Sequence, residues 1–351
     1  MIKQKVKRAV NVGGVLIGGN NPIVVQSMTN TDNNNIDATL AQIEALVRAG
    51  CSIVRLAFCN SNEKESLKKI INKSSVPLVA DIQFDYKLAI MAADIGFKAI
   101  RFNPGNIGSE EKVAEVVASA KANKIPIRVG VNLGSLDKSI EKKYGRTAKA
   151  LASSALRHAE VLEKHNFEDI VLSVKASSAP LTIEANRILH KKSDYPLHIG
   201  ITESGFGDYG SIKSAVGLGS LLADNIGDTI RVSLTGDPVA EIAVAKMILK
   251  ASGRLKEGVE IVSCPTCARC KIDLSFLAKD VELAVASIKT PVKIALMGCV
   301  VNGPGEAKDA DITLCGLGED KCALYLKGEK IKTIKAEEAV SNIKNLLQDI
   351  N

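Results

Sequence analysis

Short apolar segments alternate with longer amphipathic segments along residues 23–252 of the chain. The apolar segments are rich in Val and Ile and have the length of β-strands, as expected for strands that are buried on both faces. The predicted strands are Ile23–Thr29, Ile53–Phe58, Leu78–Phe84, Ala99–Pro104, Ile125–Asn132, Ile170–Ala176, Leu197–Glu203 and Thr229–Thr235.

The segments between these strands are rich in Ala, Leu, Lys and Glu and have helical spacing. Clear examples are Asp37–Ala49, Glu110–Asn123, Ala148–Lys164 and Val239–Ala251. A repeated strand–helix unit of this kind, with eight strands, is typical of a (β/α)8 TIM barrel. A doubly wound sheet is the alternative, but no G-x-G-x-x-G turn follows the first strand. The Gly13-Gly14 to Gly18-Gly19 segment is instead predicted to form a small hairpin that closes the bottom of the barrel.

A linker-like stretch, Gly253–Gly258, follows the last of these helices and separates a different pattern. Strands are predicted at Glu260–Ser263, Val292–Met297, Ala310–Leu314 and Ala323–Leu326, and helices at Leu274–Ile288 and Ala336–Asp349. We therefore predict two domains, a barrel over residues 1–255 that binds the substrate and a small α+β domain over residues 256–351.

Composition places the chain among ordinary globular proteins, with 46% hydrophobic and 24% charged residues among 351. No apolar run approaches the ~20 residues that span a bilayer. The basic start of the chain has two Gly-Gly pairs and no A-x-A-like cleavage site, so it is not predicted to be a signal peptide. We expect a cytoplasmic protein without a membrane segment. Its eight cysteines are then better explained by metal binding than by disulfides.

The formal net charge is +7, and the basic residues are scattered rather than clustered. Only 3% of the residues are aromatic, which leaves few platforms on which nucleic-acid bases could stack. Nucleic acid is therefore not an expected partner. A phosphorylated substrate and an acidic protein partner suit this charge equally well.

Polar and charged residues stand at the predicted C-terminal ends of the barrel strands, where TIM barrels carry their active sites. They are Arg55, Asp81, Gln83, Arg101, Asn103, Arg128, Asn132, Ser173, Lys175, Glu203, Arg231 and Ser233. Four arginines and a lysine against so few acids predict a site for a multiply anionic small molecule, because the guanidinium fork matches phosphate oxygens. A structural ion-pair network with Asp81 and Glu203 is the alternative. Glu203 is the candidate general acid or base.

Three cysteines lie close together at Cys264, Cys267 and Cys270, and Cys299 follows inside a Gly- and Pro-rich segment. C-x-x-C spacing allows two thiolates to bind one metal centre, and loops with glycine and proline expose N–H groups to sulfur. The pattern indicates a zinc site or an iron–sulfur cluster. The remaining cysteines, Cys51, Cys59, Cys315 and Cys322, lack ligand spacing and are predicted to be buried structural thiols.

Nine motifs, in order along nearly the whole chain, resemble the family of 4-hydroxy-3-methylbut-2-enyl diphosphate synthases. They are VVQSMTNT (24–31), VPLVADIQFDY (76–86), RFNPGNIG (101–108), RVGVNLGSL (128–136), SVKAS (173–177), GITESG (200–205), RVSLTGDPVAEI (231–242), SCPTCAR (263–269) and GCVVNGPGEA (298–307). The resemblance implies a TIM barrel joined to a small reductase-like domain that carries a [4Fe–4S] cluster. It also implies a two-electron reductive dehydration that opens the ring of 2-C-methyl-D-erythritol 2,4-cyclodiphosphate.

The resemblance also implies roles for particular residues. The cluster ligands would be Cys264, Cys267, Cys299 and Glu306. The carboxylate is a harder and weaker ligand than thiolate, so it could leave one iron accessible to the substrate. The substrate would be held by Arg55, Asp81, Arg101, Asn103, Arg128, Asn132, Lys175, Arg231 and Ser233. Glu203 would donate a proton to the departing hydroxyl group.

Two kinds of partner follow from the same resemblance. Ferredoxin or flavodoxin would supply electrons, and the sequence does not discriminate between these acidic proteins. A head-to-tail homodimer would let the cluster domain of one subunit cap the barrel of the other, which excludes water from the reaction.

The chain departs from the family pattern at three places. Gln83 stands where the family usually has His, so a proton role at that position is in doubt. The loop after Glu203 differs from the usual Gly-rich run with an Arg. Cys270 offers a rival fourth ligand in place of Glu306. The rival class is a phosphate-binding barrel enzyme with a closed structural zinc site, which requires Cys270 as a ligand and a colourless protein.

Overall fold

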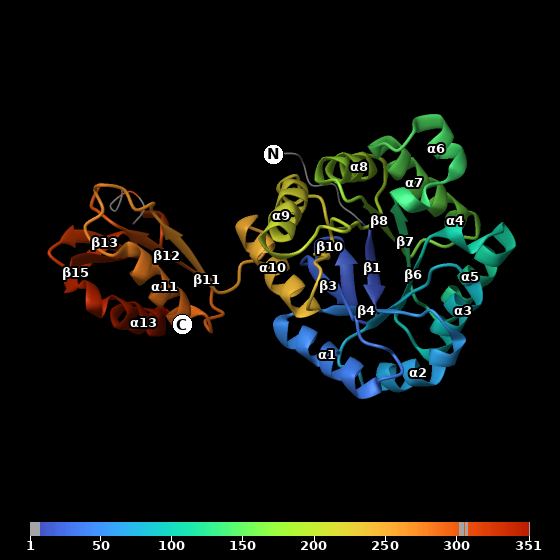
Figure 1. Ribbon diagram of the computed structural model, residues 1–351, viewed down its shortest axis with the longest axis horizontal. Helices are drawn as coiled ribbons and strands as arrows, with labels where there is room; N and C mark the ends of the chain where they lie inside the picture. Colours follow the sequence, from blue (N-terminus) through green and yellow to red (C-terminus); the bar gives the residue numbers. More distant parts are fainter. Residues whose placement is uncertain (1–7, 302–304, 306–307, 351) are drawn as a thin grey trace. The chain divides into compact units, whose positions relative to one another are not determined.

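The computed structural model describes residues 8–301, 305 and 308–350 of the chain. The chain divides into two compact units, Met1–Arg254 and Leu255–Asn351. In Figure 1 the first unit is a ring of helices around a set of parallel strands, and the second is a smaller sheet with helices packed on it.

The first unit is a TIM barrel, as predicted. Its sheet has the order β8-β7-β6-β5-β4-β3-β10-β9, and each strand is parallel to its neighbours in this order. The strands are β3 (Val24–Met28), β4 (Ile53–Ala57), β5 (Leu78–Asp81), β6 (Ala99–Phe102), β7 (Ile127–Asn132), β8 (Ile170–Lys175), β9 (His198–Ile199) and β10 (Thr229–Ile230). A parallel bridge between Leu172 and Leu197 joins β8 to the start of β9 and brings the two ends of the sheet together.

The last two barrel strands are much shorter than the predicted Leu197–Glu203 and Thr229–Thr235. Regular strand pairing ends at Ile199 and Ile230, and the chain continues from each as a loop at the end of the barrel. Gly205 has φ +109°, and its carbonyl accepts a hydrogen bond from the Thr235 N–H at 3.0 Å. The two strand ends therefore continue as loops that are tied to each other.

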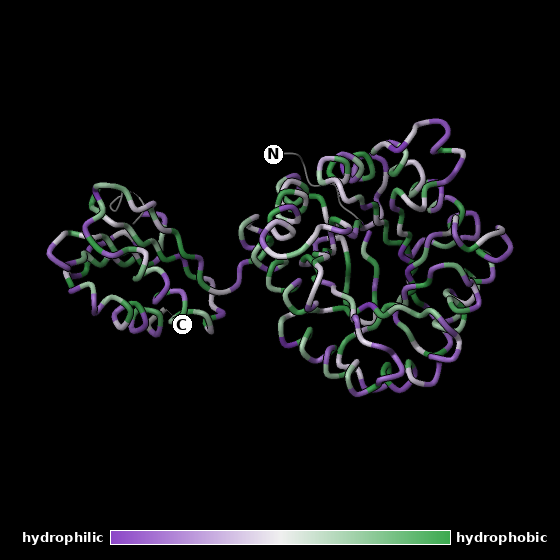
Figure 2. The backbone as a smooth tube through the Cα atoms, viewed as in Figure 1, coloured by the Kyte–Doolittle hydropathy of each residue, from purple (hydrophilic) through white to green (hydrophobic). Residues whose placement is uncertain are grey.

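Helices cover the outside of the barrel, and their ends carry the capping residues that the sequence supplies. Asn35 accepts a hydrogen bond from the Ala38 N–H at the start of α1, and Gly50 ends that helix in left-handed geometry. Figure 2 shows the apolar positions of the chain gathered on the strands and on the inner sides of the helices. The helices are α1 (Ile36–Ala49), α2 (Lys64–Lys73), α3 (Tyr86–Ile95), α4 (Pro104–Ile107), α5 (Glu110–Ala122), α6 (Lys138–Tyr144), α7 (Ala148–Lys164), α8 (Ala179–Lys192), α9 (Gly207–Ala223) and α10 (Pro238–Ala251), with the short 3-10 turns η1 (Ser61–Glu63) and η2 (Leu133–Ser135).

The predicted hairpin is confirmed as β1 (Ala9–Val12) paired with β2 (Val15–Gly18). Val12 and Ile17 of the hairpin are buried in one apolar cluster with Val24, Val79 and other residues from the first halves of barrel strands. The hairpin therefore closes the bottom of the barrel, at the end opposite the strand C-termini.

The second unit is a five-stranded sheet of order β11-β12-β13-β14-β15. Its elements are β11 (Val259–Ser263), α11 (Leu274–Val285), β12 (Val292–Met297), β13 (Ile312–Gly318), β14 (Lys321–Leu326), β15 (Glu329–Lys335), η3 (Ala336–Glu338) and α13 (Ala339–Ile350). Strand β15 was not predicted, because its residues alternate with lysines and mostly face solvent. Charged, exposed positions are common on an edge strand, where they discourage pairing with another chain.

No helix in residues 8–301, 305 and 308–350 is long and apolar enough to cross a bilayer.

Two leucines on α11 test the packing of the second unit. Leu277 is 6% exposed in its core, whereas Leu283 is 77% exposed. We expect Leu277→Ala to lower the local free energy of unfolding by about 2–5 kcal/mol, because it removes buried methyl groups and leaves a cavity. The matched Leu283→Ala should change it by less than about 0.5 kcal/mol. Hydrogen exchange of the β12–β14 amides in the full chain measures both, and equal protection in the two variants would contradict this packing.

Candidate active site and cysteine cluster

A small polar cavity of about 90 Å³ lies at the C-terminal ends of the barrel strands. It gathers residues from four strands and from the segments that follow β9 and β10. Its lining is Arg55, Arg101, Arg128, Gly130, Val131, Asn132, Ser173, Lys175, Thr202, Arg231 and Ser233. The structure therefore brings together all four predicted arginines, Lys175, Asn132 and Ser233. We call this cavity with its charged walls the cationic mouth.

Asp81 at the end of β5 holds two of these arginines. Its Oδ1 lies 2.9 Å from Arg101 Nη1, and its Oδ2 lies 3.6 Å from Arg55 Nε. Burial alone would raise the pKa of Asp81, but Arg55, Arg101 and Arg128 outweigh this effect and hold the pKa below its usual value. Asp81 therefore stays ionised and orients the guanidinium groups rather than exchanging protons.

Glu241 holds Arg231 in the same way from outside the barrel. Its carboxylate accepts from Arg231 Nε at 3.2 Å, from Ser27 Oγ at 2.8 Å and from the Leu234 N–H at 3.1 Å. Sequence reasoning missed Glu241 because it lies in the first turn of α10 and not at a strand end. Only the structure shows that Glu241 is buried, at 2% exposure, where a carboxylate requires a cationic partner.

Arg128 and Arg55 are partnered mainly by neutral groups. Arg128 Nη1 donates to Gln26 Oε1, while its buried Nη2 has no partner among the described protein atoms. Arg55 Nε and Nη2 both lie close to Met28 Sδ, at 3.2 and 3.1 Å. Burial lowers the pKa of Arg55 to about 10 and that of Arg128 well below its usual value, although Asp81 opposes both shifts.

The cationic mouth therefore has more positive charge than its acids neutralise. Four arginines line the cavity beside Lys175, and the carboxylates in contact with these arginines are Asp81 and Glu241, so the arginines alone outnumber the acids. An uncompensated buried guanidinium is costly, and a bound anion removes that cost. The alternative was a structural ion-pair network with Asp81 and Glu203. Asp81 does form such ion pairs, but Glu203 forms none within the described part of the chain, and the network leaves net positive charge at the site.

Two glycines make room for the cations. A Cβ on Gly130 would lie 2.5 Å from Arg101 Nε, and a Cβ on Gly200 would lie 2.7 Å from Lys175 Nζ. Contacts that short do not occur, so the absence of a side chain at these two positions allows Arg101 and Lys175 to lie across the barrel end.

Asn103 and Glu203 lie outside the cavity lining. Asn103 is buried and caps α4, with its Oδ1 accepting from the Gly105 N–H at 3.0 Å and its Nδ2 donating to the Ser135 carbonyl at 2.9 Å. Its side chain thus shapes the loops at the mouth. Glu203 is exposed in the loop after β9 and has φ +52°, which is uncommon for a residue with a side chain. Ser204 Oγ donates to the Ser233 carbonyl and ties this loop to the mouth. Gln83 is exposed in the loop after β5.

The second unit brings two of the predicted cysteine ligands to one edge of its sheet. Cys264 directly follows β11 and Cys299 lies two residues after β12, and these strands are parallel neighbours. The Gly298 N–H donates to Cys264 Sγ at 3.2 Å, and the Lys271 N–H donates to the Gly298 carbonyl at 2.8 Å. The cysteine loop therefore folds back on the segment that carries Cys299.

Two glycines, Gly298 and Gly316, allow the segments around these cysteines to pack closely. A Cβ on Gly316 would lie 2.5 Å from the Gly298 carbonyl oxygen, and a Cβ on Gly298 would lie 2.4 Å from Cys270 Sγ. Cys270 packs against Gly298 and donates to the Ile272 carbonyl at 3.2 Å. Cys267 is exposed. Soft thiolates at one edge, with an N–H directed at sulfur and glycines that allow close approach, fit an iron–sulfur cluster.

Glu306 lies outside the described residues. Within the described ranges, no three His, Cys, Asp or Glu side chains are grouped so that they could hold a metal ion as they stand.

The cysteines without ligand spacing are mostly buried, as predicted. Burial raises the pKa of each of the Cys51, Cys315 and Cys322 thiols to about 11, which makes them poor nucleophiles. The prediction was wrong for Cys59, which is exposed. It follows Phe58 just beyond β4, where the chain turns out of the barrel into solvent.

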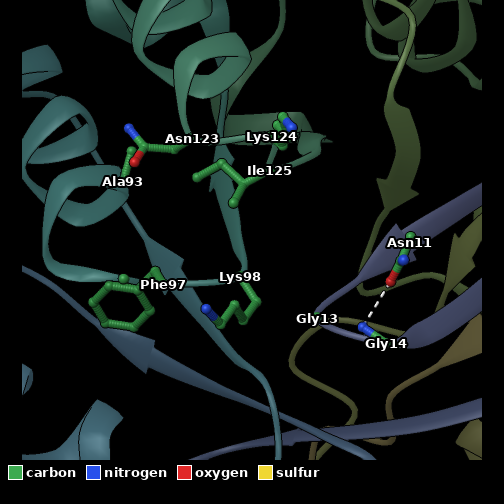
Figure 3. A pocket seen from close by; sticks show the side chains of 10 residues that line it. Asn11, Gly13, Gly14, Ala93, Phe97, Lys98, Asn123, Lys124 and Ile125 are labelled. Atoms are coloured by element: carbon green, nitrogen blue, oxygen red, sulfur yellow. Dashed lines mark hydrogen bonds between the residues drawn. The ribbon is translucent and has the colours of Figure 1, made fainter.

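A larger hollow of about 270 Å³ lies at the other end of the barrel (Figure 3). It is bordered by the hairpin turn, where Asn11 Oδ1 accepts from the Gly14 N–H at 2.7 Å, and by Lys98 and Lys124 before β6 and β7. Active sites of TIM barrels lie at the C-terminal ends of the strands, so this hollow is not the candidate site.

Fold and site together define a TIM-barrel enzyme with a cationic mouth, joined to a unit with a cysteine-rich loop. Residues 7–246 match the GcpE TIM-barrel domain, and residues 260–349 match the GcpE protein C-terminal domain. The chain belongs to the GcpE family.

Relatives in this family match almost the full chain. The 4-hydroxy-3-methylbut-2-en-1-yl diphosphate synthase (flavodoxin) of Caldanaerobacter subterraneus is 53% identical over 98% of this chain and 97% of its own length. The protein of the same name from Clostridium perfringens is 51% identical over 99% of this chain and all of its own. Among solved structures, dihydropteroate synthase from Stenotrophomonas maltophilia is similar with a TM-score of 0.51 at 12% identity, over 69% of this chain and 97% of its own. That last likeness concerns the barrel fold alone.

Gly130 tests the geometry of the cationic mouth. We expect Gly130→Ala to displace the Arg101 guanidinium from Asp81, because the new methyl group would overlap Arg101. A displaced Arg101 makes one charge-assisted hydrogen bond fewer to the bound anion. Such a bond is worth about 1.5–3 kcal/mol, so its loss lowers the affinity for the anion by roughly tenfold to a hundredfold. Calorimetric titration with inorganic diphosphate measures this. Gly219→Ala, where the methyl group meets nothing within 4 Å, is the matched control. Equal affinities in the two variants would contradict the assignment.

Proposed function

We propose that this chain catalyses the reductive ring opening and dehydration of 2-C-methyl-D-erythritol 2,4-cyclodiphosphate to (E)-4-hydroxy-3-methylbut-2-enyl diphosphate. Two electrons and two protons enter, counted on the fully protonated molecules, and one water leaves. The excess of buried positive charge in the cationic mouth supports this proposal most directly, because it suits a compact diphosphate. The names of the relatives, which match nearly the full chain, support the same reaction.

In this proposal the walls of the mouth bind the two phosphoryl groups. The binding residues are Arg55, Arg101, Arg128, Lys175 and Arg231, with Asn132 and Ser233 as neutral hydrogen-bonding groups. Asp81 fixes the directions of Arg55 and Arg101, so the guanidinium groups need no reorganisation when the substrate enters. Asn103 acts by shaping the adjacent loop. Glu203 donates the proton that leaves with the hydroxyl group as water, from a loop anchored by Ser204.

The proposed cofactor is a [4Fe–4S] cluster held by Cys264, Cys267, Cys299 and Glu306. Bound there, it would pass electrons to the substrate one at a time. The Gly298 N–H directed at Cys264 Sγ supports thiolate ligation, since such hydrogen bonds stabilise a charged sulfur. A structural zinc site is the less favoured alternative and would require Cys270, whose thiol instead donates to the Ile272 carbonyl.

Three further proposals concern partners and location. The electron donor is a flavodoxin, the protein given in the names of the relatives. The working form is a head-to-tail homodimer in which the cluster domain of one subunit serves the barrel of the other. Exposed apolar side chains support such docking on both units, with Phe84 and Phe206 in the loops at the strand ends and Val301 beside Cys299. The eight free cysteines suit the reducing cytoplasm.

Anaerobic purification followed by an absorption spectrum and metal analysis tests the cofactor. We expect a brown protein with about four irons per chain, as a [4Fe–4S] cluster requires. Cys264→Ala and Cys299→Ala should each lose colour and iron, because a thiolate ligand is missing. Cys59→Ala, at an exposed thiol away from the cluster loop, is the control. A colourless protein with one zinc would refute the redox function, and loss of iron from Cys270→Ala would show an all-cysteine site.

Mixing two inactive variants tests the dimer together with the role of Glu203. Glu203→Gln should lower kcat by about 10²–10⁴, because a general acid is lost while the cluster remains. Cys264→Ala should be inactive for lack of a cluster. After unfolding, mixing, refolding and cluster reconstitution, a head-to-tail dimer regains on the order of a quarter of the normal activity, since a mixed dimer has one intact site. Recovery of no activity, with mixed dimers present by mass, would rule out a site shared between subunits.

A further inference from the structure

Lys175 has an unusual neighbour for a lysine. Its Nζ lies 3.0 Å from Nε2 of His198, whose imidazole is 1% exposed on the adjacent strand β9. No ion pair of Lys175 with a carboxylate occurs within the described part of the chain. The other four basic residues of the cationic mouth are arginines. Three of them form ion pairs with carboxylates, two with Asp81 and one with Glu241.

The far side of the imidazole is also held. Its Nδ1 lies 3.4 Å from Thr229 Oγ1 on β10, and His198 and Thr229 are in register. If the lysine donates to Nε2, the ring carries its hydrogen on Nδ1, directed at Thr229. Gly200, two residues after His198, leaves the space that Lys175 Nζ occupies. The three side chains thus form a chain of contacts from the mouth into the barrel.

Most of the charged groups around this pair are positive. Arg55 on β4, Arg101 on β6, Arg128 on β7 and Arg231 after β10 face it, and Asp81 on β5 and Glu241 on α10 are already engaged by arginines. Burial first, and then these four arginines, hold the pKa of Lys175 well below its usual value. Burial and the nearby cations, with Lys175 first among them, likewise hold the pKa of His198 well below its usual value.

We propose that His198 is a positioning residue for Lys175, and that the Lys175–His198 pair takes up a proton when a multiply anionic ligand enters the cationic mouth. The ligand reverses the sign of the local field, so the amine becomes an ammonium group that hydrogen-bonds both to a phosphoryl oxygen and to Nε2. The proton comes from solvent, and the pair shares it as a unit. This inference rests on the proposed function for the identity of the ligand.

The sign of the pH dependence follows from the direction of the shift. The free protein has a lowered pKa at the pair, and the bound anion raises it. Proton uptake therefore occurs between the free and bound pKa values. It vanishes below the free value, where the pair is already protonated. Between the two values, the affinity falls by about tenfold per pH unit for each proton taken up.

Calorimetric titration of the cluster-loaded enzyme with the cyclodiphosphate, without reductant, measures the uptake. The cyclodiphosphate is a suitable probe because its acidic groups are ionised throughout the neutral range. The slope of the observed enthalpy against the ionisation enthalpy of the buffer gives the number of protons bound. We expect uptake approaching one proton in the wild type and none in Lys175→Met. Equal proton counts in the two proteins overturn the proton uptake, whereas failure of the wild type to bind the cyclodiphosphate overturns the proposed function itself.

Two isosteric variants test the positioning role. His198→Gln places its amide where Nε2 lies and keeps the contact with Lys175, whereas His198→Asn places its amide where Nδ1 lies and keeps only the contact with Thr229. We expect His198→Gln to bind within about threefold of the wild type and to retain proton uptake. His198→Asn should bind about tenfold more weakly, because a buried hydrogen-bond partner of a charged group is lost.

His165→Gln is the matched control. His165 lies just after α7, at the end of the barrel away from the mouth, and this change should leave affinity and proton count unaltered. Thermal unfolding of each variant without ligand separates a folding defect from a binding defect. Equal affinities and proton counts in the Gln and Asn variants overturn the positioning role of His198, whether or not Lys175 takes up the proton.

Discussion

The site of this protein depends on holding like charges close together at the end of a barrel. Arg55, Arg101, Arg128 and Arg231 converge on one small cavity, and their mutual repulsion has to be balanced before any ligand arrives. Asp81 balances two of them from within the sheet, and Glu241 balances a third from a helix outside it. The two carboxylates neutralise only part of the arginine charge, and the remaining positive charge attracts an anion. The end of β5 places Asp81, and the first turn of α10 places Glu241, whose carboxylate also accepts a hydrogen bond from the Leu234 N–H.

The same balance explains why small residues occupy the end of the barrel. Gly130 and Gly200 stand opposite long cationic side chains that cross above them. A larger residue at either position would push a cation away from its partner or from the cavity. Close packing of the interior is thus used here to direct charge, and the glycines are as much a part of the site as the arginines.

Much of this arrangement is predictable from the sequence, for identifiable reasons. The barrel follows from the alternation of buried strands and amphipathic helices, and the arginines follow because strand ends of such barrels meet at one face. Glu241 was not predicted, since a helix residue carries no signal of the side chain it meets across the chain. The early ends of β9 and β10 were not predicted either, because the loops that follow the two strands are held by contacts with each other, such as that between the Gly205 carbonyl and the Thr235 N–H. The exposure of Cys59 depends on where the chain leaves the barrel.

The excess of positive charge has a kinetic consequence. Opening a cyclic diphosphate converts one bridging ester oxygen into a free phosphoryl oxygen, so the product of the proposed reaction carries more negative charge than its substrate. A mouth that selects ligands by charge holds that product more tightly than the substrate. Tighter binding slows the departure of the product, and the exposed loop that carries Glu203 is the element at the rim that could open for it.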